Sequence, residues 1–324
     1  MALPDLARLT LDRELPTKQI RRRAKGRRAT VLNLAEDTTS TFIEPQPFLK
    51  WAGGKRALLG EIRLRTPNFE GTYIEPFLGA GAVLFDQDRE RSKIVSDYNS
   101  ELIDVYETIR DHPQLLINEL RTHVNTEEHY YEVRAWDRTP DFAKRSKIQR
   151  AARFIFLNKT NYNGLYRVNA AGQMNVPFGG QSNPDWIQED VLLSVSDFLN
   201  VRDEDDNLRT TLMRGDYRLA LKHAKPGDWV YLDPPYAETF THYQSGGFTT
   251  QDQTDLRDEI LALTRRGVPV LMSNSDVELI RDLYQDRSVF EIDTVVVRRA
   301  IGATTSSRGN VNEVMVSNFP GLGR

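Results

Sequence analysis

The sequence predicts an α/β protein with a mainly parallel sheet, and three observations support this. Residues 73–85 read as a strand, a turn with Gly79 and Gly81, and a helix. A second strand ends in Asp97, about 20 residues past the turn. Strands and helices then alternate, with strands at 211–217, 229–232 and 268–272 and helices at 251–265 and 277–284. This order is typical of a Rossmann-like sheet, and two last strands, 290–297 and 312–319, suggest an antiparallel edge.

The middle of the chain has a different pattern. Helical periodicity runs on without strands through 100–111, 113–123, 127–137 and 147–158. Residues 158–178 then read as a hairpin that turns at 170–172. We therefore expect a flexible basic arm, a sheet domain in two pieces, and a mostly helical insert that carries the hairpin: 1–45, then 46–110 with 209–324, then 111–208.

Composition describes a soluble globular protein with 39% hydrophobic and 27% charged residues. No apolar run approaches the ~18 residues of a membrane span, and no signal peptide is evident, so we expect a cytoplasmic protein without a membrane partner. The chain has no Cys, which excludes disulfides and thiolate metal sites. Its five His residues are scattered, and we expect no metal site.

Charge is unevenly distributed although the net charge is only -3. Residues 18–28 are basic, and residues 142–184 carry seven Lys or Arg without one acid. An acidic segment follows at 203–206. A charge run is usually a solvated face, but so long an acid-free stretch favours a surface that binds a polyanion.

The segment Asp233-Pro234-Pro235-Tyr236 directly follows the apolar strand 229–232. Pro cannot donate to a sheet ladder, so the strand ends there, at the edge where open α/β sheets bind ligands. The Asp233 carboxylate, the Pro234 carbonyl and the Tyr236 ring suit a planar molecule with an exocyclic amine. Four residues alone are equally compatible with a solvated turn.

The glycine turn indicates the second ligand. The third Gly of a dinucleotide fingerprint would fall at Leu84 and is missing, which argues against a pyrophosphate and against a nicotinamide oxidoreductase. Asp97 stands where an acid binds ribose hydroxyls. These residues predict an adenosine-type ligand, and S-adenosylmethionine (AdoMet) fits. Upstream, Trp51 with Lys50 and Lys55 flanks a Gly pair that lets a ligand approach the backbone, although a capped surface helix explains these residues as well.

Taken in order, these motifs resemble the Dam-type DNA adenine-N6 methyltransferases, the alpha class or D12 family. The resemblance runs from about residue 47 to residue 318 and rests on FLKWAGGK, EPFLGAG, SDYN, NKTNYNGLYRVN, GDY, DPPY and SSRGNVNEVMVSN. In this class the target-recognition region lies between the AdoMet motif and DPPY. The first forty-odd residues have no counterpart.

The resemblance implies roles for individual residues. Asp233, Pro234 and Tyr236 are the implied catalytic residues. The implied AdoMet contacts are Trp51, Lys55, Glu75, Phe77, Gly79, Gly81, Asp97 at the ribose, Asp216 and Tyr217 at the adenine ring, and Asp233 between cofactor and target base. The implied DNA contacts are Lys50, Tyr162, Asn163, Leu165, Arg167 and Pro177.

It also implies the reaction, which is methyl transfer from AdoMet to N6 of an adenine flipped out of double-stranded DNA, with S-adenosylhomocysteine as product and no metal. Residues 162–167 keep the aromatic–Asn–Gly–Leu–x–Arg pattern of relatives that methylate GATC. A bacterial or phage-encoded, nucleoid-associated protein is implied. A cognate restriction endonuclease is a compatible partner, and the oligomeric state stays open with a monomer favoured.

Two other classes remain as alternatives. One is an amino-methyltransferase acting on cytosine N4, RNA adenine or protein glutamine, although cytosine enzymes more often carry Ser at the Asp233 position and glutamine enzymes carry Asn. The other is a DNA-binding regulator with a dead cofactor site, which the intact Gly79, Asp97 and Asp233 argue against.

Overall fold

The computed structural model describes residues 43–237, 248–298 and 310–320, and its larger compact unit begins at Ile43. The predicted basic arm, 1–45, thus lies almost wholly outside the described residues. Its last residues are already part of the fold, because the Ser194 hydroxyl donates a hydrogen bond to the Ile43 carbonyl and Pro45 is buried.

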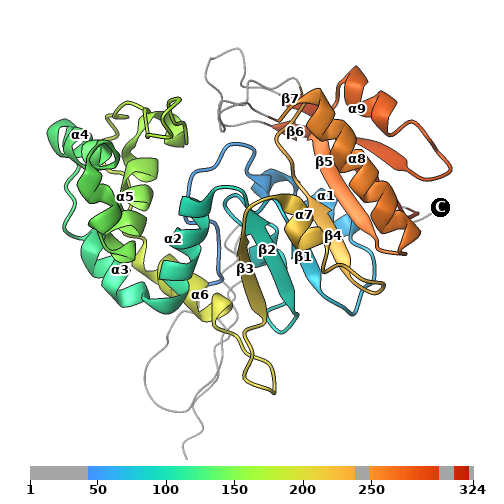
Figure 1. Cartoon of the computed structure of the whole chain (residues 1–324), viewed down its shortest axis with the longest axis horizontal. Coiled ribbons are helices and arrows are strands. Elements are labelled where there is room, and N and C mark those ends of the chain that lie inside the picture. The colour runs from blue at the N-terminus through green and yellow to red at the C-terminus, as the bar shows by residue number, and fades with distance from the viewer. Residues whose placement is uncertain (1–42, 238–247, 299–309, 321–324) are drawn as a thin grey trace, which may run out of the picture. The chain divides into compact units, whose positions relative to one another are not determined.

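A seven-stranded sheet forms the centre of the described chain, in the order β3-β2-β1-β4-β5-β7-β6 (Figure 1). Its strands are β1 (Tyr73–Glu75), β2 (Lys93–Asp97), β3 (Thr210–Arg214), β4 (Trp229–Leu232), β5 (Val270–Ser275), β6 (Glu291–Arg298) and β7 (Asn310–Ser317). The first five pair in parallel, and β7 runs antiparallel to both β5 and β6. The predicted Rossmann-like sheet with an antiparallel edge is confirmed.

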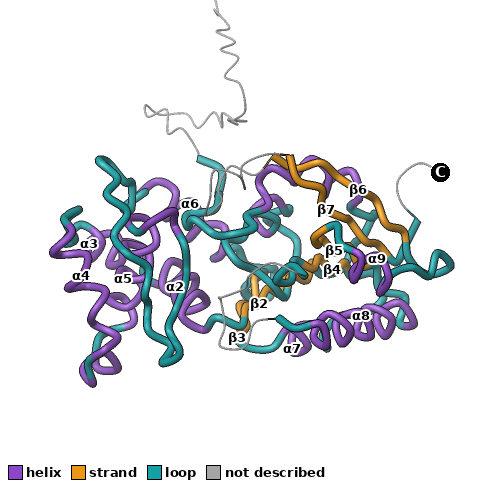
Figure 2. The backbone as a smooth tube through the Cα atoms, turned by 90° about the horizontal axis from the view of Figure 1, so that it is seen from above, coloured by secondary structure: helices purple, strands orange, loops and turns teal. Residues whose placement is uncertain are grey.

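Both faces of the sheet are covered, because its central strands alternate side chains between two hydrophobic cores. In β4, Trp229 and Tyr231 belong to one core and Val230 and Leu232 to the other. The second core packs under α7 (Tyr217–Leu221), α8 (Thr250–Arg265) and α9 (Glu278–Leu283), and Figure 2 shows α7 and α8 along one side of the strands. Strands buried on both faces read as continuous apolar runs, as residues 229–232 do.

The first core continues into a helical region beside the sheet (Figure 1). Its helices are α2 (Ser100–Asp111), α3 (Pro113–Leu120), α4 (Glu127–Arg134), α5 (Lys147–Thr160) and α6 (Glu189–Leu199), with 3₁₀ turns η3 (Ala135–Arg138) and η4 (Pro140–Lys144). A capping box of Ser146 and Gln149 starts α5 at the predicted place. Helix α6 was not expected from the sequence pattern. The division into a cofactor domain and a recognition domain stays a prediction.

Two predicted elements differ in the structure. The helix expected after the glycine turn is only a 3₁₀ turn, η2 (Leu84–Asp86), because residues 76–92 must hold both the turn and the return to the start of β2. The hairpin arms meet through two isolated bridges, Val168 with Met174 and Asn161 with Phe178, instead of a regular ladder. One arm contains the turn η5 (Tyr162–Gly164), which interrupts strand geometry.

A search of the described residues for a long apolar helix found none that could cross a membrane.

Candidate active site

Four acidic residues predicted for the site stand at the ends of neighbouring strands. Glu75 ends β1, Asp97 ends β2, Asp216 follows β3, and Asp233 follows β4. Because β3, β2, β1 and β4 are adjacent and parallel, these acids come to the same edge of the sheet.

Asp233 is held through both carboxylate oxygens. Its Oδ2 lies 2.7 Å from Nζ of the buried Lys55, and its Oδ1 accepts a hydrogen bond of 3.0 Å from the Ser273 hydroxyl. Ser273 in turn lies 2.9 Å from the Tyr231 hydroxyl. Burial raises the pKa of Asp233, and the positive charge of Lys55 opposes this shift. Lys55, expected at the cofactor, therefore also fixes the carboxylate of Asp233.

The backbone of the DPPY corner is clamped by buried amides. Gln253 donates to the Pro235 carbonyl at 2.9 Å, and the Ala237 N–H donates to the Asn274 side chain at 3.1 Å. Asn274 and Gln253 are themselves joined at 3.1 Å. Within the described ranges no donor reaches the Pro234 carbonyl.

Tyr236 is fixed at its hydroxyl and at one ring face. The hydroxyl donates to Oε2 of Glu313 at 2.6 Å, and Nζ of Lys55 lies 4.8 Å from the ring centroid. Burial raises the pKa of Tyr236, so the phenol remains a donor at neutral pH.

Glu75 is a second carboxylate deep in the same corner. It is 2% exposed, and the Tyr73 hydroxyl donates to its Oε2 at 2.9 Å. Burial raises its pKa well above the usual range, and the nearby charge of Asp233 adds to the shift.

The glycine turn brings Gly79, Asp97 and Trp51 together. The Gly79 N–H donates to Oδ2 of Asp97 at 3.0 Å, and the Asn99 N–H donates to its Oδ1 at 2.9 Å. Gly79 has φ 49° and Gly81 has φ 71°, a region that favours glycine. A Cβ on Gly79 would lie 2.8 Å from Cδ1 of Trp51. A side chain there would displace the indole from the turn.

Tyr217 and Asp216, the two residues predicted to contact the adenine ring, lie in different surroundings. Tyr217 stacks on Phe77 with ring centroids 5.3 Å apart, and Phe248 closes this aromatic group at 6.1 Å from Phe77. Asp216 caps α7 by accepting the Arg218 N–H at 2.8 Å and also pairs with the Arg218 side chain. Its carboxylate therefore has a structural role beside the predicted one.

The recognition segment, residues 162–178, presents a surface Tyr and Arg. Tyr162 is 48% exposed, and its N–H donates to the Pro177 carbonyl at 3.0 Å. The exposed Arg167 donates through Nε to the Asn175 side chain at 2.7 Å and through Nη2 to the Asn175 carbonyl at 3.3 Å. A guanidinium has five N–H donors, so about three remain for DNA.

The turn at the start of this segment is built by its Asn-Gly sequence. Asn163 and Gly164 have φ of 58° and 66°, conformations that these residue types tolerate best. The turn brings Gly164 against Lys50, whose Nζ donates to the Lys159 carbonyl at 3.2 Å. Leu165 follows, half-buried against the small core under the hairpin.

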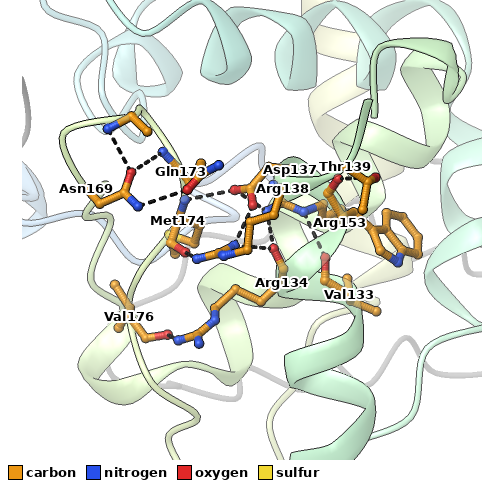
Figure 3. A network of polar contacts seen from close by, with 12 residues as sticks. Val133, Arg134, Asp137, Arg138, Thr139, Arg153, Asn169, Gln173, Met174 and Val176 are labelled. Atoms are coloured by element: carbon orange, nitrogen blue, oxygen red, sulfur yellow. Dashed lines mark hydrogen bonds and ion pairs between the residues drawn. The ribbon is translucent and has the colours of Figure 1, made fainter. Parts of the chain in front are cut away.

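The buried ion pair of Asp137 and Arg153 is linked to the second arm of the hairpin (Figure 3). Oδ2 of Asp137 lies 2.6 Å from Nη2 of Arg153 and accepts the Met174 N–H at 2.8 Å. Arg134 donates to the Val176 carbonyl at 2.9 Å. These contacts tie the second hairpin arm to α5, α4 and η3.

The acid-free stretch 142–184 is less available to a polyanion than its sequence suggests. Lys144 pairs with Asp141, Lys147 with Glu107, and Arg153 with Asp137. The fold brings acids from before residue 142 to these cations. The surface expected to contact DNA is therefore limited mainly to the recognition segment and Lys50.

Comparison with known proteins agrees with this geometry. Residues 51–301 match the family model described as D12 class N6 adenine-specific DNA methyltransferase. The chain belongs to this family. It is 40% identical to the Type II methyltransferase M1.LlaDCHI of Lactococcus lactis subsp. cremoris, over 86% of this chain and 96% of the relative. It is also 36% identical to the Type II methyltransferase M.MjaIII of Methanocaldococcus jannaschii, over 86% and 100%, and 33% identical to the DNA adenine methylase of Escherichia coli K12, over 85% and 96%.

The family resemblance drawn from the motifs is thereby confirmed. Sequence reasoning missed several buried polar residues of this D12 class methyltransferase: Gln253, Ser273, Asn274 and Glu313. Glu313 lies in β7 directly before the apolar residues 314–316, and an acid at that place was the available signal. Buried carboxylates need a partner, so such a residue indicates a polar contact.

The contact between Tyr236 and Glu313 predicts graded effects at this tyrosine. Tyr236→Ala should lower kcat/KM about 10- to 100-fold, because base stacking contributes about 1–3 kcal/mol. Tyr236→Phe keeps the ring and loses the hydrogen bond to Glu313, so a smaller loss of about three- to tenfold is expected. Glu313→Gln keeps an amide oxygen that accepts from the Tyr236 hydroxyl, so it should cost less than Tyr236→Phe in steady-state kinetics. Equal damage by Phe and Ala would remove the stacking explanation.

The raised pKa of Glu75 predicts that replacing this residue changes the stability of the fold in a pH-dependent way. Its folded-state pKa is raised, so the folded state holds its proton to higher pH than the unfolded state, and this group destabilises the fold as pH rises. Glu75→Gln should therefore raise the melting temperature at pH 8 by more than at pH 4.5, as scanning calorimetry would show. A melting temperature lowered equally at both pH values would contradict this.

Proposed function

We propose that this D12 class enzyme transfers a methyl group from AdoMet to N6 of an adenine flipped out of double-stranded DNA. The observation that carries the proposal is the DPPY corner. There the fixed Asp233 carboxylate and the Pro234 carbonyl stand beside an oriented Tyr236 ring. Two acceptors and a ring face are what an aromatic amine requires.

The residues present fit AdoMet. Asp97 lies at the end of β2 beside the turn of Gly79 and Gly81, where a ribose would bind, and Trp51 borders the turn. Phe77 and Tyr217 provide flat apolar surface for an adenine ring. The carboxylates of Asp233 and Glu313 lie with the buried ammonium of Lys55 in the described part of the corner, and their negative charge would favour a cationic sulfonium. AdoMet, when bound, supplies a methyl group made electrophilic by this sulfonium.

The chain's own residues prepare the amine. The lone pair of N6 is delocalised into the purine, so the amine is a weak nucleophile. Hydrogen bonds from its two hydrogens to Asp233 and the Pro234 carbonyl would draw the nitrogen towards tetrahedral geometry and direct the lone pair. Lys55 and Ser273 keep Asp233 in place for this. The proton of N6 leaves after transfer, to Asp233 or to water.

Flipping the base costs a few kcal/mol, and three groups of residues offset it. Stacking on Tyr236 contributes about 1–3 kcal/mol. Tyr162, exposed at the start of the recognition segment, would fill the vacated stack. Cations such as Lys50 and Arg167 would contact DNA and make binding salt-dependent.

We propose that the recognition sequence is GATC. Arg167 sits on a hairpin arm, and an arginine fork suits O6 and N7 of guanine in the major groove. The pattern of residues 162–167 supports the same site. Two relatives are named type II methyltransferases, which supports a restriction endonuclease of the same specificity as a partner.

One experiment tests activity and site together. The full chain is incubated with AdoMet and unmethylated plasmid, and modified bases are mapped by long-read sequencing. Methyl-adenine at GATC alone is expected. Modification of cytosine, or of RNA in a parallel incubation, would favour the other amino-methyltransferases. AdoMet binding without any methylation would favour a silent DNA-binding regulator.

A further inference from the structure

Tyr166 lies inside the proposed DNA-recognition segment, yet its ring packs on the loop proposed to border AdoMet. The rings of Tyr166 and Trp51 stack with centroids 5.5 Å apart and an interplanar angle of 28°. Phe154 on α5 stacks on Tyr166 at 5.3 Å and on Trp51 at 6.3 Å. Trp51 itself contacts Gly79. A continuous series of contacts therefore leads from Tyr166 through Trp51 to the glycine turn.

The backbones of the same two segments are joined by one buried side chain. Asn158, 1% exposed, accepts the Lys50 N–H at 2.8 Å and donates to the Lys50 carbonyl at 2.8 Å. It also donates to the Gly164 carbonyl at 3.3 Å. A Cβ on Gly164 would lie 2.3 Å from Cβ of Lys50. Lys50, directly before Trp51, and Gly164, two residues before Tyr166, are thus held in register with each other.

The hydroxyl end of Tyr166 faces the ribose side of the site. It lies 3.5 Å from Oε2 of Glu101, on the first turn of α2, and this helix begins three residues after Asp97. Tyr162, by contrast, is 48% exposed. The two tyrosines of one segment therefore face different surroundings, Tyr162 the solvent and Tyr166 the cofactor side.

We propose that Tyr166 is a positioning residue for AdoMet binding, acting through Trp51, which its ring holds against the glycine turn. The proposal rests on the proposed function, because it takes AdoMet as the ligand of that turn. Tyr166 occupies the unspecified position of the aromatic–Asn–Gly–Leu–x–Arg pattern, so the pattern assigned it no role.

Calorimetric titration of AdoMet into the full chain, without DNA, tests this. Tyr166→Ala is expected to weaken AdoMet binding about three- to tenfold, the range of one aromatic pair. Tyr166→Phe keeps the stack and should stay within about twofold of wild type. Tyr166→Leu fills space without a flat face, so it should behave as Ala does and replaces that variant if Ala does not fold.

Val168→Ala is the matched control, because it truncates an apolar side chain two residues further along the same segment, outside the aromatic group. Its AdoMet affinity should equal that of wild type. In steady state, Tyr166→Ala should raise KM for AdoMet while saturating AdoMet restores most of kcat. A general packing defect would lower kcat and the melting temperature instead.

The outcomes are distinct. If Ala and Leu variants bind AdoMet as wild type does, Tyr166 does not position the cofactor loop and the inference is wrong. If Phe is as weak as Ala, the hydroxyl near Glu101 is responsible and the stack is not. If wild type itself binds no AdoMet, the proposed function falls, and this inference falls with it.

Discussion

Asp233→Asn is expected to lower kcat for methyl transfer at least about 100-fold, the usual effect of removing one electrostatic contact to a reacting group. Asn keeps the size of the side chain but loses the charge, and its NH₂ would compete with the N6 hydrogens for the Pro234 carbonyl. Methylation of a GATC duplex under single-turnover conditions measures the chemical step. Retention of more than about a tenth of the wild-type rate would rule out the assigned role, since that is only about 1.4 kcal/mol.

Stability needs a separate control, because Asp233 pairs with a buried cation. Lys55 is 5% exposed and Asp233 is 19% exposed, so losing one partner leaves a buried charge and should cost about 2–3 kcal/mol. Asp233→Asn combined with Lys55→Met removes both charges and should recover most of that loss in a urea titration. The double variant should stay inactive. Recovery of activity along with stability would show that Asp233 acts only through the fold.

Arg167→Ala is expected to weaken binding to the recognition site by about 1–3 kcal/mol and to relax the choice at one base pair. The reason is that a guanine-reading Arg discriminates between bases, whereas an Arg on a phosphate weakens all sequences alike. Methylation of a library with randomised positions around adenine separates the two. An unchanged sequence preference would remove Arg167 from the recognition set.

Two further variants make this test quantitative. Lys144→Ala removes one positive charge from the same stretch, but Lys144 already pairs with Asp141 at the surface, so it should leave the sequence preference unchanged. Asn175→Ala keeps the Arg167 guanidinium but removes the Asn175 side chain, whose Oδ1 accepts a hydrogen bond of 2.7 Å from Nε of Arg167 and so orients it. A partial relaxation at the same base pair is expected. Relaxation by Lys144→Ala would mean that net charge sets the specificity.

Part of this structure could be predicted from the sequence, because properties of short segments determine it. Prolines end β4 after Leu232, the Ser146 capping box starts α5, and β4 itself is apolar throughout; these are properties of short segments. Parallel order then brings Glu75, Asp97 and Asp233 to one edge, so the site followed from the fold class. The prediction of a helix after the glycine turn was wrong, because the length of chain available between that turn and β2 depends on where β2 begins.

The sequence by itself determined the sheet, the glycine turn, the DPPY corner and the family. Only the tertiary structure decided how these are held: the pairing of Lys55 with Asp233, the contact of Tyr236 with Glu313, and the stack of Trp51 with Tyr166. Each pair is more than seventy residues apart in the chain. Hydrophobic periodicity fixes which face of an element is buried, whereas a contact between two polar or aromatic side chains depends on how separate elements pack. That packing is a property of the whole chain, and no local pattern encodes it.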